Sequence, residues 1–219
     1  MRKLISILFV AVLALMGGLT GGSVSAQTTE CDFVTGGGFI IPDPAANGAH
    51  GNFGVGGGCN NNGPNAPFWG HLEYVDHGSG LAPATAPTPF NVHGTGVTGY
   101  FFMGPTTREI SGRARTNDSN NSSVNYCVHV TDNGPGSTDI FQIQLTDNSG
   151  GVIYESGPHT LEGGNIELHK HKPSNTGSFS SGSCLVSSCQ PAGLPCAVDS
   201  DCCGGGTVLF CINSVCTHE

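Results

Sequence analysis

Charged residues are scarce in this sequence, and basic residues are the scarcest of them. Lys and Arg number 7 against 16 Asp and Glu, and charged residues make up 11% of the 219 residues. The formal net charge of −9 argues against nucleic acids and anionic membranes as partners, because both select basic surfaces. Long apolar runs are also lacking beyond residue 26, so we expect no membrane insertion by the rest of the chain.

Segments suited to long helices are missing as well. The chain contains 35 Gly and 13 Pro, and each Gly inside a helix costs about 1 kcal/mol relative to Ala. Gly shows no period of three, which excludes collagen, and recurring Phe and β-branched residues exclude a highly charged disordered chain. An all-β fold of short strands joined by many turns remains.

The first 26 residues have the pattern of a secretory signal peptide. Arg2 and Lys3 precede an apolar stretch from Ile5 to Met16, and small residues at 24–26 suit cleavage before Gln27. We therefore expect a protein secreted to the extracellular space or the cell surface. Its net charge after cleavage is −11, because both residues lost from the charge balance are basic.

All ten cysteines follow the predicted cleavage point. An even number of cysteines after a signal peptide predicts five disulfides, whereas a zinc cluster would need CxxC pairs, which the sequence lacks. Six of the ten fall in the last 31 residues. We expect three mature parts: a β domain at 27–173, a Ser/Gly-rich linker at 174–188 and a disulfide-stapled module at 189–219.

Apolar and polar residues alternate along much of the long part, which is typical of strands with one face on a core. Phe141, Ile143 and Leu145, for example, alternate with Gln142 and Gln144. About nine strands predict an antiparallel β-sandwich or a flattened barrel. The expected strands lie near 33–41, 50–57, 68–77, 89–103, 110–115, 124–131, 141–145, 151–156 and 164–171.

Two disulfides can be argued from these strands. A hairpin folded about residue 45 places Cys31 opposite Cys59, within the reach of a bridge. By elimination, the two cysteines left in the first part of the chain, Cys127 and Cys184, are expected to pair. That bond would tie the linker to the β domain.

Several short stretches, taken in order, resemble the bacterial post-COAP domain, over roughly residues 32–172. The resemblance implies a secreted β-rich domain of unknown molecular function, and it brings no catalytic residues to this chain. The stretches that carry it are 34–40, 52–54, 70–77, 130–134, 138–143 and 163–169.

The C-terminal spacing Cys-x6-Cys-x5-Cys-Cys-x7-Cys-x4-Cys, from Cys189 to Cys216, is similar to that of inhibitor cystine knots (knottins). The resemblance implies an inhibitor, a toxin or a structural cap. No Lys or Arg occurs in the tail, which disfavours an inhibitor of trypsin-like proteases. The implied disulfides are Cys189–Cys203, Cys196–Cys211 and Cys202–Cys216.

Two predicted strands carry alternating imidazoles and carboxylates. Alternate strand residues lie about 6.6–6.8 Å apart, so two imidazoles on one face can converge on Zn²⁺ or Cu²⁺. If the two strands adjoin, four His and two Glu form one candidate zinc site. If they do not, the residues are solvent-facing polar groups on the outer face. The set is His71, Glu73, His77, Glu167, His169 and His171.

The loop from Asp132 to Asp139 offers carboxylates and backbone carbonyls that suit calcium. The alternative is an Asx-turn hairpin, in which both carboxylates accept hydrogen bonds from backbone N–H groups. The loop does not have the spacing of an EF-hand.

Trp69, the only tryptophan, shares a predicted face with His71 and Glu73. Exposed aromatic rings on a sheet suit sugar binding, whereas an edge Trp can also simply pack against a loop. Glu73 and Glu167 would serve glycoside hydrolysis only if their carboxylates lay about 5–9.5 Å apart, and nothing in the sequence indicates this. No nucleophile elbow precedes a helix.

We therefore expect a non-catalytic protein of the cell exterior, with a binding or structural role and no cofactor other than calcium or zinc. Its expected partner is a surface glycan or another extracellular protein. Two alternatives stay open: a glycan- or metal-binding module with hydrolase activity, and a knottin-type inhibitor or toxin carried by the tail.

Overall fold

The structure is a computed structural model that describes residues 30–45, 48–60, 67–135, 138–171 and 177–186, together with the backbone of 209–212 and 215–218. The predicted signal peptide at 1–26 lies outside these residues. The regular structure within them is all β. Among them, no helix has the length and apolar character needed to cross a membrane.

The strands occur close to where the alternation predicts them. The one addition is the two-residue β9, which pairs with β7. The strands before the tail are β1 (Phe33–Ile40), β2 (Gly51–Cys59), β3 (Phe68–Asp76), β4 (Phe90–Phe102), β5 (Thr107–Thr116), β6 (Ser123–Thr131), β7 (Ile140–Thr146), β8 (Val152–Glu155), β9 (His159–Thr160) and β10 (Gly163–His169).

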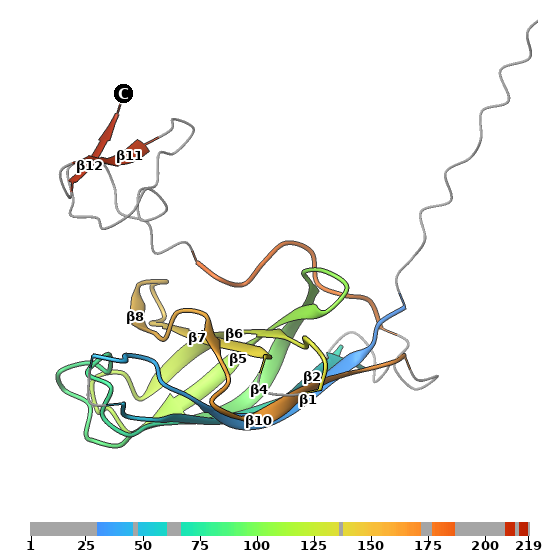
Figure 1. The fold of residues 1–219 in the computed structure, drawn as a ribbon, viewed down its shortest axis with the longest axis horizontal. Helices are drawn as coiled ribbons and strands as arrows, with labels where there is room; N and C mark the ends of the chain where they lie inside the picture. Colours follow the sequence, from blue (N-terminus) through green and yellow to red (C-terminus); the bar gives the residue numbers. More distant parts are fainter. Residues whose placement is uncertain are drawn as a thin grey trace, which may run out of the picture.

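These strands form one antiparallel sheet, in the order β10-β1-β2-β3-β4-β5-β6-β7-β8. The sheet curls into a half-barrel (Figure 1). The predicted sandwich would need two sheets, so the flattened-barrel alternative describes this part of the chain better. Curling lets one sheet cover itself: Phe53 of β2 stacks on Phe141 of β7, with ring centroids 3.9 Å apart.

The inward-facing side chains make one apolar core. Phe141, Ile143 and Leu145, which alternate in the sequence, are fully buried. A tyrosine of the central strand β3 meets one of the edge strand β8 in this core, because the hydroxyls of Tyr74 and Tyr154 lie 2.6 Å apart. Burial of these apolar groups is the main force that holds the curl.

The open edge of β10 is closed by carboxylates rather than by another strand. Asp139 accepts a hydrogen bond from the Ile166 N–H at 2.7 Å, and Asp132 accepts one from the Leu168 N–H at 2.8 Å. Both carboxylates belong to the loop between β6 and β7. They satisfy backbone donors that an edge strand otherwise leaves unpaired.

Two disulfides join distant parts of the described chain. Cys31 and Cys59 are bonded with their Cα atoms 6.0 Å apart, across the β1–β2 hairpin that predicts this pair. Cys127 and Cys184 are bonded with their Cα atoms 5.6 Å apart. The second bond attaches residues 177–186, which we name the strap, to β6.

The strap lies against the sheet although it falls within the predicted linker. Ser180 forms a parallel bridge with Phe101 of β4, and its N–H donates to the Tyr100 carbonyl at 2.7 Å. Phe179 stacks on the Tyr100 ring at a centroid distance of 5.5 Å. The described part of the linker is therefore attached to the domain by backbone, aromatic and covalent contacts.

In the tail, β11 (Leu209–Ile212) and β12 (Val215–His218) form an antiparallel hairpin. Cys211 and Cys216 face each other in its backbone register. The other four tail cysteines lie outside the described residues, as do the side chains of this pair.

Candidate functional site

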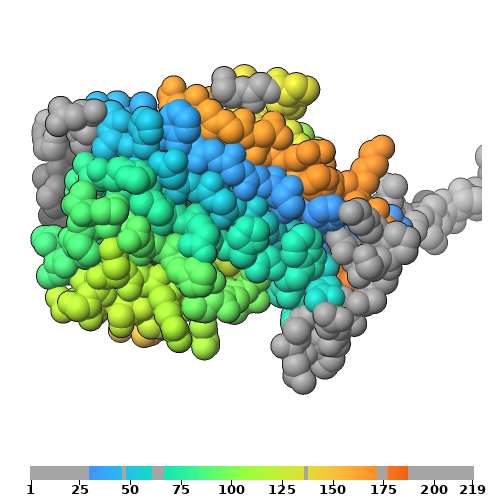
Figure 2. All heavy atoms as spheres, turned by 90° about the horizontal axis from the view of Figure 1, so that it is seen from below, coloured from blue at the N-terminus to red at the C-terminus, as the bar shows by residue number. Residues whose placement is uncertain are grey.

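Strand β2 carries almost no side chains on its outer face, whereas its neighbours β1 and β3 do. The outward positions of β2 are Asn52, Gly54, Gly56 and Gly58. A Cβ added at Gly54 would meet no atom within 4 Å, so the backbone floor is open there. Figure 2 looks onto this face, where the strands cross in order from orange β10 through blue β1 and cyan β2 to green β4.

A hollow of about 480 Å³ lies over this open floor. We name it the glycine hollow. Phe39 of β1 and Val75 of β3 supply apolar surface, while Asn52 and Glu73 supply polar groups. Its lining residues are Gly38, Phe39, Asn52, Phe53, Gly54, Glu73, Val75, Gly163 and Gly164.

A second hollow, of about 370 Å³, adjoins the first on the same face. We name it the asparagine hollow. The two share Glu73 and Val75, so together they run across the strands from β10 to β5. The second hollow is lined by Glu73, Tyr74, Val75, Asn91, Val92, His93, Arg115, Thr116 and Asn117.

An exposed hydrogen-bonded pair of side chains lies on the boundary between the hollows. Glu73 and His93 are direct cross-strand partners, and the Glu73 carboxylate bonds to Nδ1 of His93. Their side chains are 54% and 66% exposed, which leaves both accessible from solvent. Arg115 of β5 is the next partner in this row, opposite His93.

Two free amides accompany this pair. Asn52 and Asn91 are exposed, and their side-chain amides have no hydrogen-bond partner among the described residues. Each amide offers both donors and an acceptor. Asn117, by contrast, is held in place, because its side chain bonds to the Asn91 N–H and to the Pro89 carbonyl, each at 2.9 Å.

Trp69 lies further along the same face, outside both hollows. Its ring centroid is 5.7 Å from that of Phe33, which stacks in turn on His169 at 4.4 Å. A Cβ on Gly58 would come within 2.9 Å of the Trp69 Nε1 atom, so the indole covers that glycine. Trp69 also lines a separate hollow of about 550 Å³ between β3 and β4.

The six residues of the predicted zinc site come from strands that do not adjoin. β1 and β2 separate β3 from β10, which puts the two sets about 14 Å apart at the usual strand spacing. His169 bonds instead to the Thr35 hydroxyl at 2.8 Å, and His171 to the Cys31 carbonyl at 2.9 Å. His71 and His77 are exposed. Glu73 and Glu167 are likewise farther apart than a glycosidase pair.

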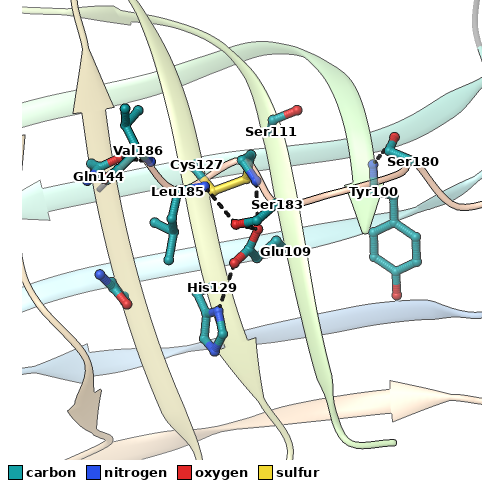
Figure 3. The surroundings of a disulfide bond; sticks show 12 residues. Tyr100, Glu109, Ser111, Cys127, His129, Gln144, Ser180, Ser183, Leu185 and Val186 are labelled. Carbon is teal, nitrogen blue, oxygen red and sulfur yellow. Dashed lines mark hydrogen bonds and ion pairs between the residues drawn. A yellow bond between two sulfur atoms is a disulfide. The ribbon is translucent and has the colours of Figure 1, made fainter. Parts of the chain in front are cut away.

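One group of three metal-type ligands does come together in the described part of the chain. Ligand atoms of Glu109, Cys127 and Cys184 lie within 4.8 Å of one another. The two sulfurs form the Cys127–Cys184 disulfide. The Glu109 carboxylate accepts hydrogen bonds from the Ser183 hydroxyl and the Cys184 N–H of the strap (Figure 3). In this oxidised state the group serves as an anchor.

The Asp132–Asp139 loop has the geometry of the Asx-turn alternative. Asp132 accepts hydrogen bonds from the Gly134 and Leu168 N–H groups, and Asp139 from those of Asn133 and Ile166. All four carboxylate oxygens therefore already have a donor. A calcium ion would have to displace these bonds.

Sequence reasoning predicted that Trp69, His71 and Glu73 share one strand face and that Glu167 and His169 share a face of another strand. Both sets lie on the outer face of the sheet. The same reasoning missed the residues that line the hollows beside Glu73. The available signal was the run of glycines at the alternate positions 54, 56 and 58, which predicts a strand with one bare face. The missed residues are Phe39, Asn52, Val75, Asn91, His93 and Arg115.

The resemblances to post-COAP domains and knottins remain expectations from the sequence, and the site is defined by its geometry. A scan against models of known protein families, a search of curated proteins and a search of solved structures each found no match for this chain.

Proposed function

We propose that this protein is a secreted, non-catalytic carbohydrate-binding module, with its ligand on the outer face of the sheet. The observation that carries the proposal is the pair of adjoining hollows, in which apolar surface lies beside amides that have no partner in the described chain. Phe39 and Val75 supply the apolar surface, and Asn52 and Asn91 supply the amides.

This mixture of groups suits a sugar. A sugar ring presents C–H groups to apolar side chains, and its hydroxyls can donate to carboxylates and can both donate to and accept from amides. The charges in the hollows are mixed, with Glu73 beside His93 and Arg115. A neutral ligand fits this balance better than a polyanion does.

The absence of a second nearby carboxylate supports a binding role. Among the described residues that line the two hollows, Glu73 is the only acid, whereas glycoside hydrolysis ordinarily uses two. The two disulfides are consistent with an oxidising or extracellular compartment. The predicted signal peptide at 1–26 supports secretion.

We further propose that residues 189–219 form a knottin-like module attached through the strap. The cysteine spacing supports this, and the Cys211–Cys216 register of the β11–β12 hairpin is compatible with it. An inhibitor or toxin role for the tail is the competing proposal. Glycan binding that survives deletion of 187–219 would favour the sheet as the active element.

The direct test is a glycan array probed with the protein lacking residues 1–26. Asn52→Ala and Asn91→Ala remove exposed amides that hold nothing else in the described chain, so both variants should fold. We expect each to weaken binding to a positive glycan by about 2- to 12-fold, the usual loss for one hydrogen bond.

The matched control is Asn165→Ala. Asn165 is an exposed asparagine on the same face, but it lines neither hollow. It should leave affinity unchanged. No glycan above background, or an equal loss in all three variants, would overturn the proposal.

A further inference from the structure

We propose that the ligand is a linear oligosaccharide of at least two sugar units that lies across the strands and fills both hollows at once. This inference rests on the proposed function and specifies the ligand class and its direction.

The two free amides lie in one row across the sheet. Asn52 is in register with Val75, and Val75 is in register with Asn91. Two strand spacings therefore separate the amide-bearing residues, about 9.5 Å. A ligand that places one ring against each amide therefore has at least two units. Val75 between them offers an apolar surface on which a ring can lie.

A second row runs parallel to the first. Gly54, Glu73, His93 and Arg115 are successive cross-strand partners from β2 to β5. The row begins on open floor at Gly54 and ends at an exposed guanidinium. Polar groups therefore line the path of a ligand that crosses the strands from β2 to β5.

The perpendicular path, along β2, is closed. The His71 ring lies 3.4 Å from the place of a Cβ on Gly56, and Phe33 and Trp69 crowd the corresponding place on Gly58. An extended ligand that starts at Gly54 thus meets side chains if it runs along β2, and open surface if it runs across the strands. The shape of the outer face therefore favours a ligand that crosses the strands.

The test takes a neutral glycan that binds on the array and measures the affinity of its oligomers, from the monomer to the hexamer. Calorimetry or NMR titration gives the affinity of each oligomer. We expect affinity to rise at least tenfold from one unit to three and then to level off. Asn52→Ala and Asn91→Ala should both weaken the trimer, whereas the monomer should respond to only one of them.

A side chain introduced at a glycine of the hollow gives a second measurement, and a second glycine provides the matched control. Gly54 and Gly96 are both strand glycines at which an added Cβ meets no atom within 4 Å, but Gly54 lines the glycine hollow, whereas Gly96 lines the separate hollow beside Trp69. We expect Gly54→Gln to reduce trimer affinity at least fivefold, and Gly96→Gln to leave it unchanged.

The outcomes separate the two proposals. Affinity that does not depend on length, or a trimer that responds to only one asparagine, would overturn the crossing ligand while leaving a carbohydrate module intact. Loss of trimer binding in Gly96→Gln but not in Gly54→Gln would move the site to the hollow beside Trp69. Failure of every glycan to bind would instead remove the proposed function itself.

Discussion

The side chain of Gln144 on β7 pairs with the backbone of Val186 in the strap through two hydrogen bonds. The Val186 N–H donates to Oε1 at 2.8 Å, and Nε2 donates to the Val186 carbonyl at 2.8 Å (Figure 3). Gln144 is only 1% exposed. The buried side-chain amide satisfies both backbone groups of Val186, as the backbone of a neighbouring strand would. It thereby holds the strap on the outer face of the sheet.

Replacing this amide should loosen the strap. Gln144→Leu keeps the side-chain volume but leaves the Val186 N–H and carbonyl without partners, so we expect a loss of about 1–3 kcal/mol in the free energy of unfolding. Hydrogen exchange at the Val186 amide should accelerate. Gln142→Leu is the control, since Gln142 is on the same strand and face but bonds to Glu155. Unchanged exchange at Val186 would contradict the anchoring role.

Acid should weaken the strap through Glu109. Burial raises the pKa of the Glu109 carboxyl, but hydrogen bonds from His129, the Cys184 N–H and the Ser183 hydroxyl together lower it more, so the net pKa lies below its ordinary value. The ionised carboxylate therefore stabilises the fold above the ordinary carboxyl pKa. That contribution is lost as pH falls through the lowered pKa of the folded state.

The measurement compares unfolding free energies of the native protein and Glu109→Gln between pH 7 and pH 2.5. We expect the variant to be less stable by about 1–3 kcal/mol at neutral pH and the gap to close in acid. Glu162→Gln, at an exposed position, should show no such gap. A difference that stays constant with pH would mean that Glu109 acts through packing rather than charge.

Asp139 should stabilise the closure between the β6–β7 loop and β10. Its side chain is fully buried, so Asp139→Ala leaves the buried Ile166 N–H and the partly buried Asn133 N–H without this acceptor, and the buried donor alone should cost about 1–3 kcal/mol. Exchange at the Ile166 amide should rise, while the Leu168 amide, held by Asp132, serves as the internal control. Millimolar calcium should not raise the melting temperature; a rise would favour the calcium-loop interpretation.

Tyr126 and Tyr154 should respond in opposite ways to loss of the hydroxyl. Both are 2% exposed, but the Tyr126 hydroxyl is the one buried side-chain polar atom in the described chain with no hydrogen-bond partner. The Tyr154 hydroxyl instead bonds to Tyr74 and donates to Asp76 at 3.0 Å. Burial raises the pKa of Tyr126 to about 12, so its hydroxyl stays neutral well above physiological pH.

We expect Tyr126→Phe to be neutral or to stabilise the protein by up to about 1 kcal/mol, and Tyr154→Phe to destabilise it by about 1–3 kcal/mol. Urea unfolding of both variants under non-reducing conditions checks this. A marked destabilisation by Tyr126→Phe would show that its hydroxyl has a bound partner in solution.

Local sequence patterns predicted much of the fold. The alternation around Phe141, Ile143 and Leu145 predicted a half-buried strand because period-two spacing places these side chains on one face whatever the neighbouring strand is. The Cys31–Cys59 pair followed from one hairpin, which is a contact between neighbouring elements. The number of sheets did not follow, because curling one sheet and stacking two bury the same alternating residues.

The candidate site shows the same division. Glu73 was recognisable as an outward polar residue, yet its partners depend on strand order and register. No pattern in the sequence places His93 beside it, or puts β1 and β2 between β3 and β10. The alternation placed Gln144 on the face away from the core, and the strap, which returns 42 residues later, buries it there.

The amino-acid sequence alone therefore predicted the all-β character, the strand positions, the outward faces and two disulfides. Most of these depend on backbone propensity or on the side-chain period within one or two adjacent elements, and the Cys127–Cys184 pair followed by elimination. The tertiary structure alone decided the half-barrel, the paired hollows, the carboxylate-closed edge and the hydrogen bonds that hold the strap on the sheet. Each of these is set by which distant segments meet when the apolar face is buried, and many strand orders would satisfy the same local pattern.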